Sequence, residues 1–146
     1  MKVINRQAKF DYEVKDRLEA GIVLTGAEAK SAKLGQVDLA TAFCKFKPGR
    51  FGPELWVYNL HIYPYQHADN TDYDPKKARK LLVHKRELIA LQSRMNQARL
   101  LLIPTAMYTH SGLVKLELGL ARGKRKYEKR EAIKKRDLDR EIAGQV

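Results

Sequence analysis

The feature that most limits how this chain can fold is its last 26 residues, 121–146, which are too polar to join a hydrophobic core. This basic tail contains ten Lys or Arg and five Asp or Glu, a net charge of +5. Its apolar residues Ile133, Leu138 and Ile142 form a line that is too thin for a docked helix. We therefore predict a folded domain over 1–120 and a tail that is disordered when free, because helix nucleation is costly.

The basic tail nevertheless favours helix in its residue types, and charges of both signs alternate along it. We predict that it becomes helical on a polyanion. The alternative is a solvated terminus that only aids solubility. The whole chain carries +12, and residues 1–120 alone hold 19 basic and 12 acidic residues. A body and a tail that are both basic indicate a nucleic-acid partner, with affinity that falls as salt is added.

Membrane attachment and secretion are not expected. The sequence has no run of 18 apolar residues, and its N-terminus lacks the apolar segment of a secretory signal. The single cysteine, Cys44, rules out an intramolecular disulfide and a cysteine-based zinc site. These observations suit a reducing cytoplasm.

The usual signatures of catalysis are missing. The sequence contains no phosphate loop, no G-x-G-x-x-G, no HExxH and no G-x-S-x-G, so we expect no enzyme activity, no metal and no cofactor. Glu19, Glu28 and Glu117 could in principle support acid–base chemistry. In a basic protein, however, such glutamates more often pair internally with Lys or Arg.

Alternating apolar residues over 113–121 predict a strand with Val114, Leu116, Leu118 and Leu120 on one face. Further strands are expected at 12–14, 22–25, 38–47, 55–62 and 99–109, with an edge position or a bulge at Pro104, and helices at 27–34 and 85–97. Turns are expected after Gly35, at 48–53 and at 109–112, and an irregular polar loop at 64–75. About six short strands with two or three helices predict a mainly β fold, an OB-like antiparallel barrel.

Basic residues gather around a short apolar run at 81–83. Arg79 and Lys80 precede it, and Lys85 and Arg86 follow it. A second polar group, Asn5, Arg6 and Lys9, lies near the N-terminus. We interpret both groups as contacts to RNA.

Aromatic residues could add stacking on bases. We interpret Trp56 and Tyr58 as part of the barrel core or surface. Tyr127 differs, because it lies among cations with no local core to join, which suits stacking on a nucleobase or on a peptide-like surface.

Several stretches together resemble one protein family. They are NRQAKFDYE, EAGIVLTGAEAKSAK, YNLHIYPY, DPKKARKLLVHKREL and LARGKRKYEKREAIKKRD, starting at positions 5, 19, 58, 74 and 120. In this order and over nearly the whole chain, the sequence is similar to the SsrA-binding proteins, the partners of transfer-messenger RNA (tmRNA) in bacterial ribosome rescue.

The resemblance implies an OB-like barrel that binds the transfer-RNA-like domain of tmRNA, with Asn5, Glu19, Lys30, Leu82 and His84 at positions of the RNA-binding body. Glu19 would order the RNA-facing surface or accept a hydrogen bond from a base, since phosphate would repel it.

The resemblance also implies a ribosome-contacting tail that enters the decoding centre and the empty messenger channel, and becomes helical there. The tail residues that we assign to this contact are Gly123, Lys124, Arg125, Tyr127, Glu128, Lys129, Arg130, Lys134, Lys135 and Arg136. The partners implied are tmRNA and both ribosomal subunits at the decoding site. Elongation factor Tu and alanyl-tRNA synthetase would be reached indirectly, through the RNA.

The sequence departs from the family pattern at three places. Ala29 and Ala32 replace larger apolar residues, the turn at 48–53 is longer than usual, and the segment after Ile142 lacks a basic finish and is expected to contribute little. Two other functions stay open from the residues alone: an RNA-processing enzyme that uses Glu19 or Glu117, and a structural ribosomal protein.

Overall fold

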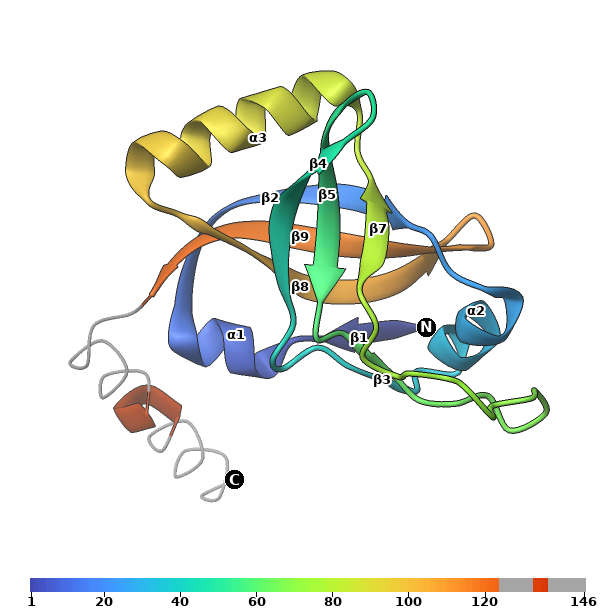
Figure 1. Cartoon of the computed structure of the whole chain (residues 1–146). Helices are drawn as coiled ribbons and strands as arrows, with labels where there is room; N and C mark the ends of the chain where they lie inside the picture. The colour runs from blue at the N-terminus through green and yellow to red at the C-terminus, as the bar shows by residue number, and fades with distance from the viewer. Residues whose placement is uncertain (124–132, 137–146) are drawn as a thin grey trace.

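The computed structural model describes residues 1–123 and 133–136. In this part of the chain, strands predominate (Figure 1). The elements are β1 (Lys2–Ile4), α1 (Arg6–Asp11), β2 (Tyr12–Ile22), α2 (Gly26–Lys33), β3 (Val37–Asp38), β4 (Phe43–Gly49), β5 (Gly52–Tyr58), β6 (His61–Ile62), β7 (Arg79–Leu82), α3 (Lys85–Ala98), β8 (Leu101–His110) and β9 (Leu113–Gly123).

The described strands form a closed ring. The larger sheet has the order β1-β8-β4-β5-β7-β2-β9, and an additional β8–β9 pairing closes the six strands from β8 to β9 into a ring, with β1 added beside β8. Closure removes the exposed edges that an open sheet would leave. The expectation of a mainly β, barrel-like fold with about six strands in the ring and a few short helices is confirmed.

The barrel interior is filled by the inward-facing half of each strand. On β9 these residues are Val114, Leu116, Leu118 and Leu120, so the predicted alternation is confirmed. Leu88 and Leu91 of α3 pack on the same core, and α3 lies along one end of the barrel (Figure 1). Buried and more exposed side chains alternate along such a strand because successive side chains point to opposite faces of the sheet.

Both predicted helices are present. Thr25 caps α2 with a capping box to Glu28, and Gly35 follows the helix with φ +77°, as the sequence predicted. α3 begins and ends within one residue of the predicted range. At Pro104 the β8–β9 register shifts, which confirms a bulge there, and the predicted hairpin turn lies at Ser111 and Gly112.

Several boundaries differ from the sequence prediction. Asn59, with φ +58°, turns the chain after β5, so the strand expected over 55–62 is two strands in different sheets. The strand expected over 38–47 is likewise split into β3 and β4. β2 is one long strand that includes both the segment near Tyr12 and Ile22, and Val23 is exposed beyond its end.

The hairpin between β4 and β5 is also tighter than predicted. Pro48 and Pro53 face each other inside the ladder, and Gly49 pairs with Gly52, so only residues 50–51 form the turn. The N-terminal residues 1–10, for which no helix or strand was predicted, form β1 and α1. Their order comes from tertiary pairing with β8, which local sequence patterns do not report.

The end of β9 bears on the domain boundary. Ala121 is fully buried and pairs with Leu101, and the strand continues to Gly123. We therefore propose that the folded domain reaches Gly123 rather than residue 120. Beyond Gly123, the structure describes residues 133–136, which are helical and exposed. Across the described residues, no helix has the length and apolar character needed to span a membrane.

Candidate nucleic-acid interface

A groove of about 630 Å³ lies between β2, the tip of the β4–β5 hairpin, β7 and the start of α3. It brings together residues that are far apart in the sequence. Five of the predicted RNA contacts line it, from β2, β7 and the start of α3: Glu19, Lys80, Leu82, His84 and Lys85. The groove is therefore where the tertiary structure concentrates the predicted contacts of the body.

The apolar wall of the groove is made by a close approach of two strands. Gly21 of β2 pairs with Leu82 of β7, and a Cβ on Gly21 would lie 3.3 Å from the Leu82 Cβ. Glycine thus allows Leu82 to lie against β2 while its side chain stays 55% exposed to solvent. An exposed leucine in the groove offers an apolar contact for a base or a ribose.

The groove carries charges of both signs in equal number. Lys80, Lys85 and Lys115 line it together with Glu19, Glu54 and Glu87. The N-terminal end of α3 also lies here, with His84 at its N-cap, and this end of a helix carries a partial positive charge. The lysines and this helix end can contact phosphates, whereas the carboxylates can accept hydrogen bonds from base amino groups.

Glu19 is held in place by its neighbours. It accepts a hydrogen bond from the Tyr108 hydroxyl, and its Oε1 lies 3.7 Å from His110 Nδ1. The Tyr108 hydrogen bond lowers the pKa of Glu19 most, and His110 and Lys115 also lower it. Burial, together with Glu19, raises the pKa of Tyr108 to about 12. Glu19 is therefore an oriented, ionised acceptor, suited to the amino group of a base rather than to a phosphate.

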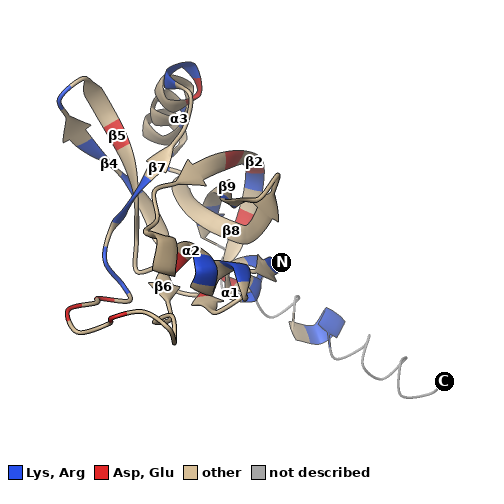
Figure 2. Cartoon of the chain, turned by 90° about the vertical axis from the view of Figure 1, so that its right-hand side faces the viewer, with Lys and Arg blue, Asp and Glu red and all other residues tan. Residues whose placement is uncertain are grey.

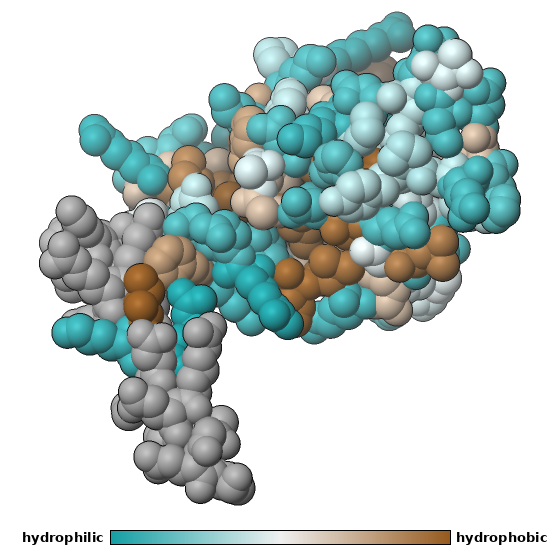
Figure 3. Space-filling model, turned by 90° about the horizontal axis from the view of Figure 1, so that it is seen from below, coloured by the Kyte–Doolittle hydropathy of each residue, from teal (hydrophilic) through white to brown (hydrophobic). Residues whose placement is uncertain are grey.

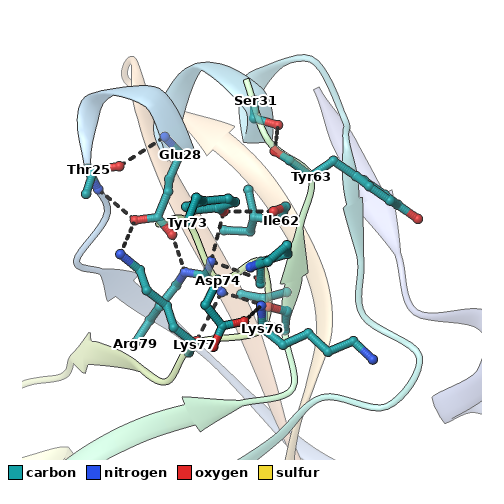
Figure 4. Close-up of polar contacts among 12 residues, drawn as sticks. Thr25, Glu28, Ser31, Ile62, Tyr63, Tyr73, Asp74, Lys76, Lys77 and Arg79 are labelled. Atoms are coloured by element: carbon teal, nitrogen blue, oxygen red, sulfur yellow. Dashed lines mark hydrogen bonds and ion pairs between the residues drawn. The ribbon is translucent and has the colours of Figure 1, made fainter. Parts of the chain in front are cut away.

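Arg79, in contrast, lies inside the protein, so the expectation that it contacts RNA directly conflicts with its burial. Its side chain is 1% exposed, and Nε lies 2.5 Å from Glu28 Oε2 (Figure 4). The guanidinium also donates to the carbonyl oxygens of Leu60 and Pro75 and to the Tyr73 hydroxyl. These bonds tie the polar loop over 64–75 to the barrel, so Arg79 organises the protein interior.

Glu28 is the anionic centre of this network. Burial alone would raise its pKa, but the hydrogen bond from the Thr25 N–H and the contacts with Arg79 and Lys77 lower the pKa overall. The Lys77 Nζ lies 3.2 Å from Glu28 Oε1. The sequence prediction that such a glutamate pairs internally with Lys or Arg is confirmed for Glu28.

Asn5 is also buried, at 3% exposure. Its amide donates to the carbonyl oxygens of Leu39 and Pro104 at 3.0 and 2.8 Å, and its oxygen caps α1 by accepting from the Ala8 N–H. With these bonds made, the side chain joins three segments of the fold. Direct contact with RNA, as expected from the sequence, conflicts with this burial.

The remaining predicted body contacts are exposed but lie outside the groove lining. Arg6 and Lys9 are on α1, Lys30 is on α2 with its Nζ 5.6 Å from the Tyr65 ring centroid, and Arg86 is in the first turn of α3. Cationic segments are thus distributed over several elements (Figure 2). Seen from below, the surface is mostly hydrophilic with small separate hydrophobic patches (Figure 3).

The predicted tail contacts divide in two. Lys124, Arg125, Tyr127, Glu128, Lys129 and Arg130 lie outside the described residues. Gly123 ends β9, and Lys134, Lys135 and Arg136 lie in the exposed helical turn, where the Arg136 guanidinium is 4.9 Å from the Phe10 ring centroid.

The sequence did not indicate two residues near Glu19. Tyr108 donates a hydrogen bond to Glu19, and Lys115 lines the groove. The signal was weak: each lies on a regular strand, and only the β2–β9–β8 pairing brings them to Glu19. Glu19 and Glu117 face each other across β2 and β9, and like charges directly opposite each other are destabilising. Each carboxylate has its own polar neighbours. Tyr108 and His110 contact Glu19, and Thr105 and Arg17 contact Glu117.

The chain is similar to known proteins in both sequence and fold. The model of the SmpB protein family matches residues 2–146. The chain is 45% identical over 138 residues to the SsrA-binding protein of Carboxydothermus hydrogenoformans, covering 94% of this chain and 90% of the relative. It is also 45% identical over 144 residues to that of Desulfitobacterium hafniense (strain DSM 10664 / DCB-2), covering 97% and 90%.

A solved structure, described as "tmRNA-SmpB: a journey to the center of the bacterial ribosome", contains a chain similar to this one. The two share 41% sequence identity and superpose with a TM-score of 0.69, covering 90% of this chain and 94% of the other. Sequence and fold both indicate the same family. This chain belongs to the SmpB family of SsrA-binding proteins.

Proposed function

We propose that this protein is the RNA-binding adaptor of trans-translation: it binds tmRNA and acts with it on stalled ribosomes. The observation that carries the proposal is the groove, in which five predicted RNA contacts from separate segments meet on a basic protein. The names of the relatives and the tmRNA–SmpB structure support the same function. Its ligand on the RNA is the transfer-RNA-like domain.

Within the groove, we assign different roles to neighbouring side chains. Lys80 and Lys85 neutralise phosphates, which supplies affinity and salt dependence. Glu19 accepts a hydrogen bond from an exposed base edge, and Leu82 contacts a base or ribose. Arg6, Lys9, Lys30 and Arg86 add phosphate contacts around the groove. Arg79 and Asn5 act through the fold, by holding the loop over 64–75 and α1.

We assign the ribosome-dependent step to the basic tail. Its motif, from Gly123 to Arg130, and the exposed cations Lys134, Lys135 and Arg136 bind ribosomal RNA in the decoding centre and the empty messenger channel. Both ribosomal subunits are then partners, and elongation factor Tu and alanyl-tRNA synthetase act through the RNA. The protein itself performs no catalytic step and works in the cytoplasm.

A truncation that ends at Gly123 tests this division. Ending there rather than at residue 120 keeps the buried Ala121 and the full β8–β9 ladder, and the truncated chain keeps a net charge of +8. Both proteins are titrated with tmRNA over a range of salt concentrations and then assayed for tagging on stalled ribosomes. We expect RNA affinity within a few-fold of the full chain and loss of tagging. Loss of RNA binding in the truncation would make the tail the main RNA anchor and contradict the proposal.

A further inference from the structure

One outer face of the barrel combines aromatic rings and lysines, and apart from Lys80 it has no role in the function above. It is the outer surface of β4, β5 and β7, which lie side by side (Figure 1). We call it the aromatic–lysine face, and its residues are Phe43, Lys45, Lys47, Trp56, Tyr58 and Lys80.

The strand pleat places these side chains together. Register pairs Phe43 with Tyr58, and Lys45 with Trp56, which in turn pairs with Lys80. The alternate residues of the same strands, such as Leu55 and Val57, are fully buried. The aromatic–lysine face is therefore directed away from the core, and barrel packing does not account for its rings.

The rings and cations are arranged as a stack. Phe43 and Tyr58 are stacked, with centroids 5.5 Å apart and planes 17° from parallel. The Nζ of Lys45 lies 5.3 Å from the Phe43 centroid, and that of Lys47 lies 4.8 Å from the Trp56 centroid. Lys45 and Lys47 are exposed, so each ammonium can leave its ring for a phosphate while a base takes its place on the ring.

The face is continuous with the groove. Lys80 belongs to both, and its Nζ lies 3.6 Å from Glu54, which also lines the groove and accepts a hydrogen bond from the Trp56 indole N–H. RNA bound in the groove thus has a direct path onto Trp56. Blue positions on β4 and β7 show the cations along this path (Figure 2).

We propose that the aromatic–lysine face is a second RNA contact that takes unpaired nucleotides, with Trp56 stacking on a base and Lys45 and Lys47 on the adjoining phosphates. Rings beside mobile cations are the pattern by which proteins hold single-stranded RNA without reading its sequence. This inference rests on the proposed function, because it extends the groove's RNA site to bases that leave the duplex.

The protein offers a direct probe, since Trp56 is its single tryptophan. Emission from the full-length chain is followed while two RNAs are titrated: the transfer-RNA-like domain of tmRNA, and an unstructured oligouridine of about eight nucleotides. We expect both RNAs to quench Trp56. Replacing Trp56 by Leu should weaken binding about 5- to 150-fold, the range for one base stacked on one ring, whereas Trp56→Phe keeps most of the affinity.

Two double variants that each remove two positive charges test the role of the lysines. The double variant Lys45→Ala/Lys47→Ala should reduce the salt dependence of binding by about two phosphate contacts. The control Lys2→Ala/Lys33→Ala removes the same charge from exposed positions on β1 and α2 and should change binding much less. Thermal unfolding of each variant verifies that the barrel is intact.

The outcomes separate this inference from the proposed function. Tight binding of the transfer-RNA-like domain with unchanged Trp56 emission, and wild-type affinity of Trp56→Leu, would overturn the second contact and leave the proposed function standing. Failure of the full chain to bind the transfer-RNA-like domain at all would overturn both. Quenching by the oligouridine but not by the transfer-RNA-like domain would also overturn the contact with tmRNA, and would leave the face as a site for other unpaired RNA.

Discussion

Arg79 and Lys80 are adjacent cations on β7 with opposite fates. The Arg79 side chain is 1% exposed and bonded to Glu28, whereas the Lys80 side chain is 43% exposed and lies in the groove. The difference comes from the pleat, which directs successive side chains to opposite faces of a strand. A cluster of basic residues in the sequence is therefore not one basic patch on the surface.

The comparison extends to the two regions that these residues represent. The Glu28–Arg79 pair is buried and hydrogen-bonded, and it joins the loop over 64–75 to the barrel, so changes there should act on folding. The groove is open and its charges are only loosely paired, so changes there should act on RNA binding. Measurements that separate stability from affinity can test this contrast.

Replacing Arg79 by Ala should have the largest effect. The change leaves the buried Glu28 carboxylate without its closest cation. It also removes the donor to the Leu60 and Pro75 carbonyl oxygens. We expect these losses together to lower the free energy of unfolding by about 3–5 kcal/mol. Urea unfolding measures this loss. Arg79→Lys keeps the charge but not the planar set of donors, so its free energy of unfolding should lie between those of wild type and Arg79→Ala. A stable Arg79→Ala variant that has lost RNA affinity would show that Arg79 is a contact residue after all.

Asn5→Ala sharpens the comparison for a second buried residue. The change leaves the Leu39 and Pro104 carbonyl oxygens without a side-chain donor and removes the cap of α1, and we expect a loss of about 2 kcal/mol. Thermal or urea unfolding gives the value. RNA affinity, measured well below the melting temperature, should stay close to wild type. A selective loss of affinity at unchanged stability would instead support direct contact.

The pH dependence of stability should carry the signature of Glu28. Its pKa in the folded protein lies below the ordinary value of 4.5, so the unfolded state binds more protons in that range. The stabilisation is present above about pH 4.5 and is lost as the pH falls through the folded-state pKa. Urea unfolding at a series of pH values should give a shallower acid slope for Glu28→Gln than for wild type. Equal slopes would show that other carboxylates dominate.

Lys80→Ala should have the smallest effect on the protein and a selective one on RNA. We expect stability within about 0.5 kcal/mol of wild type, because the Glu54 pair is partly exposed. RNA affinity should fall a few-fold, with a salt dependence lowered by about one phosphate contact. Lys33→Ala on α2 is the matched control. Equal affinities for the two variants would remove Lys80 from the interface.

Much of the barrel was predictable because its signals are local. The alternation over 113–121, the glycine after α2 and the spacing of apolar residues in α3 each reflect a repeat within one element. The errors occur where pairing with distant strands decides the structure. Residues 1–10 are ordered by β8, and Asn59 divides the strand expected over 55–62 through a single positive φ.

The site was predictable in part for the same reason. Glu19, Lys80, Leu82, His84 and Lys85 came from a family resemblance and from a charge cluster, and all five line the groove. Tyr108 and Lys115 were missed, since nothing in their local sequence relates them to Glu19.

The sequence by itself determined the family, the β-rich class and the positive net charge, which favours a polyanion as partner. It also predicts that a basic tail follows a folded body. Composition and local periodicity are properties of the chain alone, so no contact is needed to detect them. Only the tertiary structure decided which polar residues line the exposed groove and which are buried. Strand pairing brings Gly21 against Leu82 and Tyr108 to Glu19, and barrel closure buries Arg79 and Asn5. Those outcomes depend on register between segments up to 99 residues apart, as in the bond from Asn5 to Pro104.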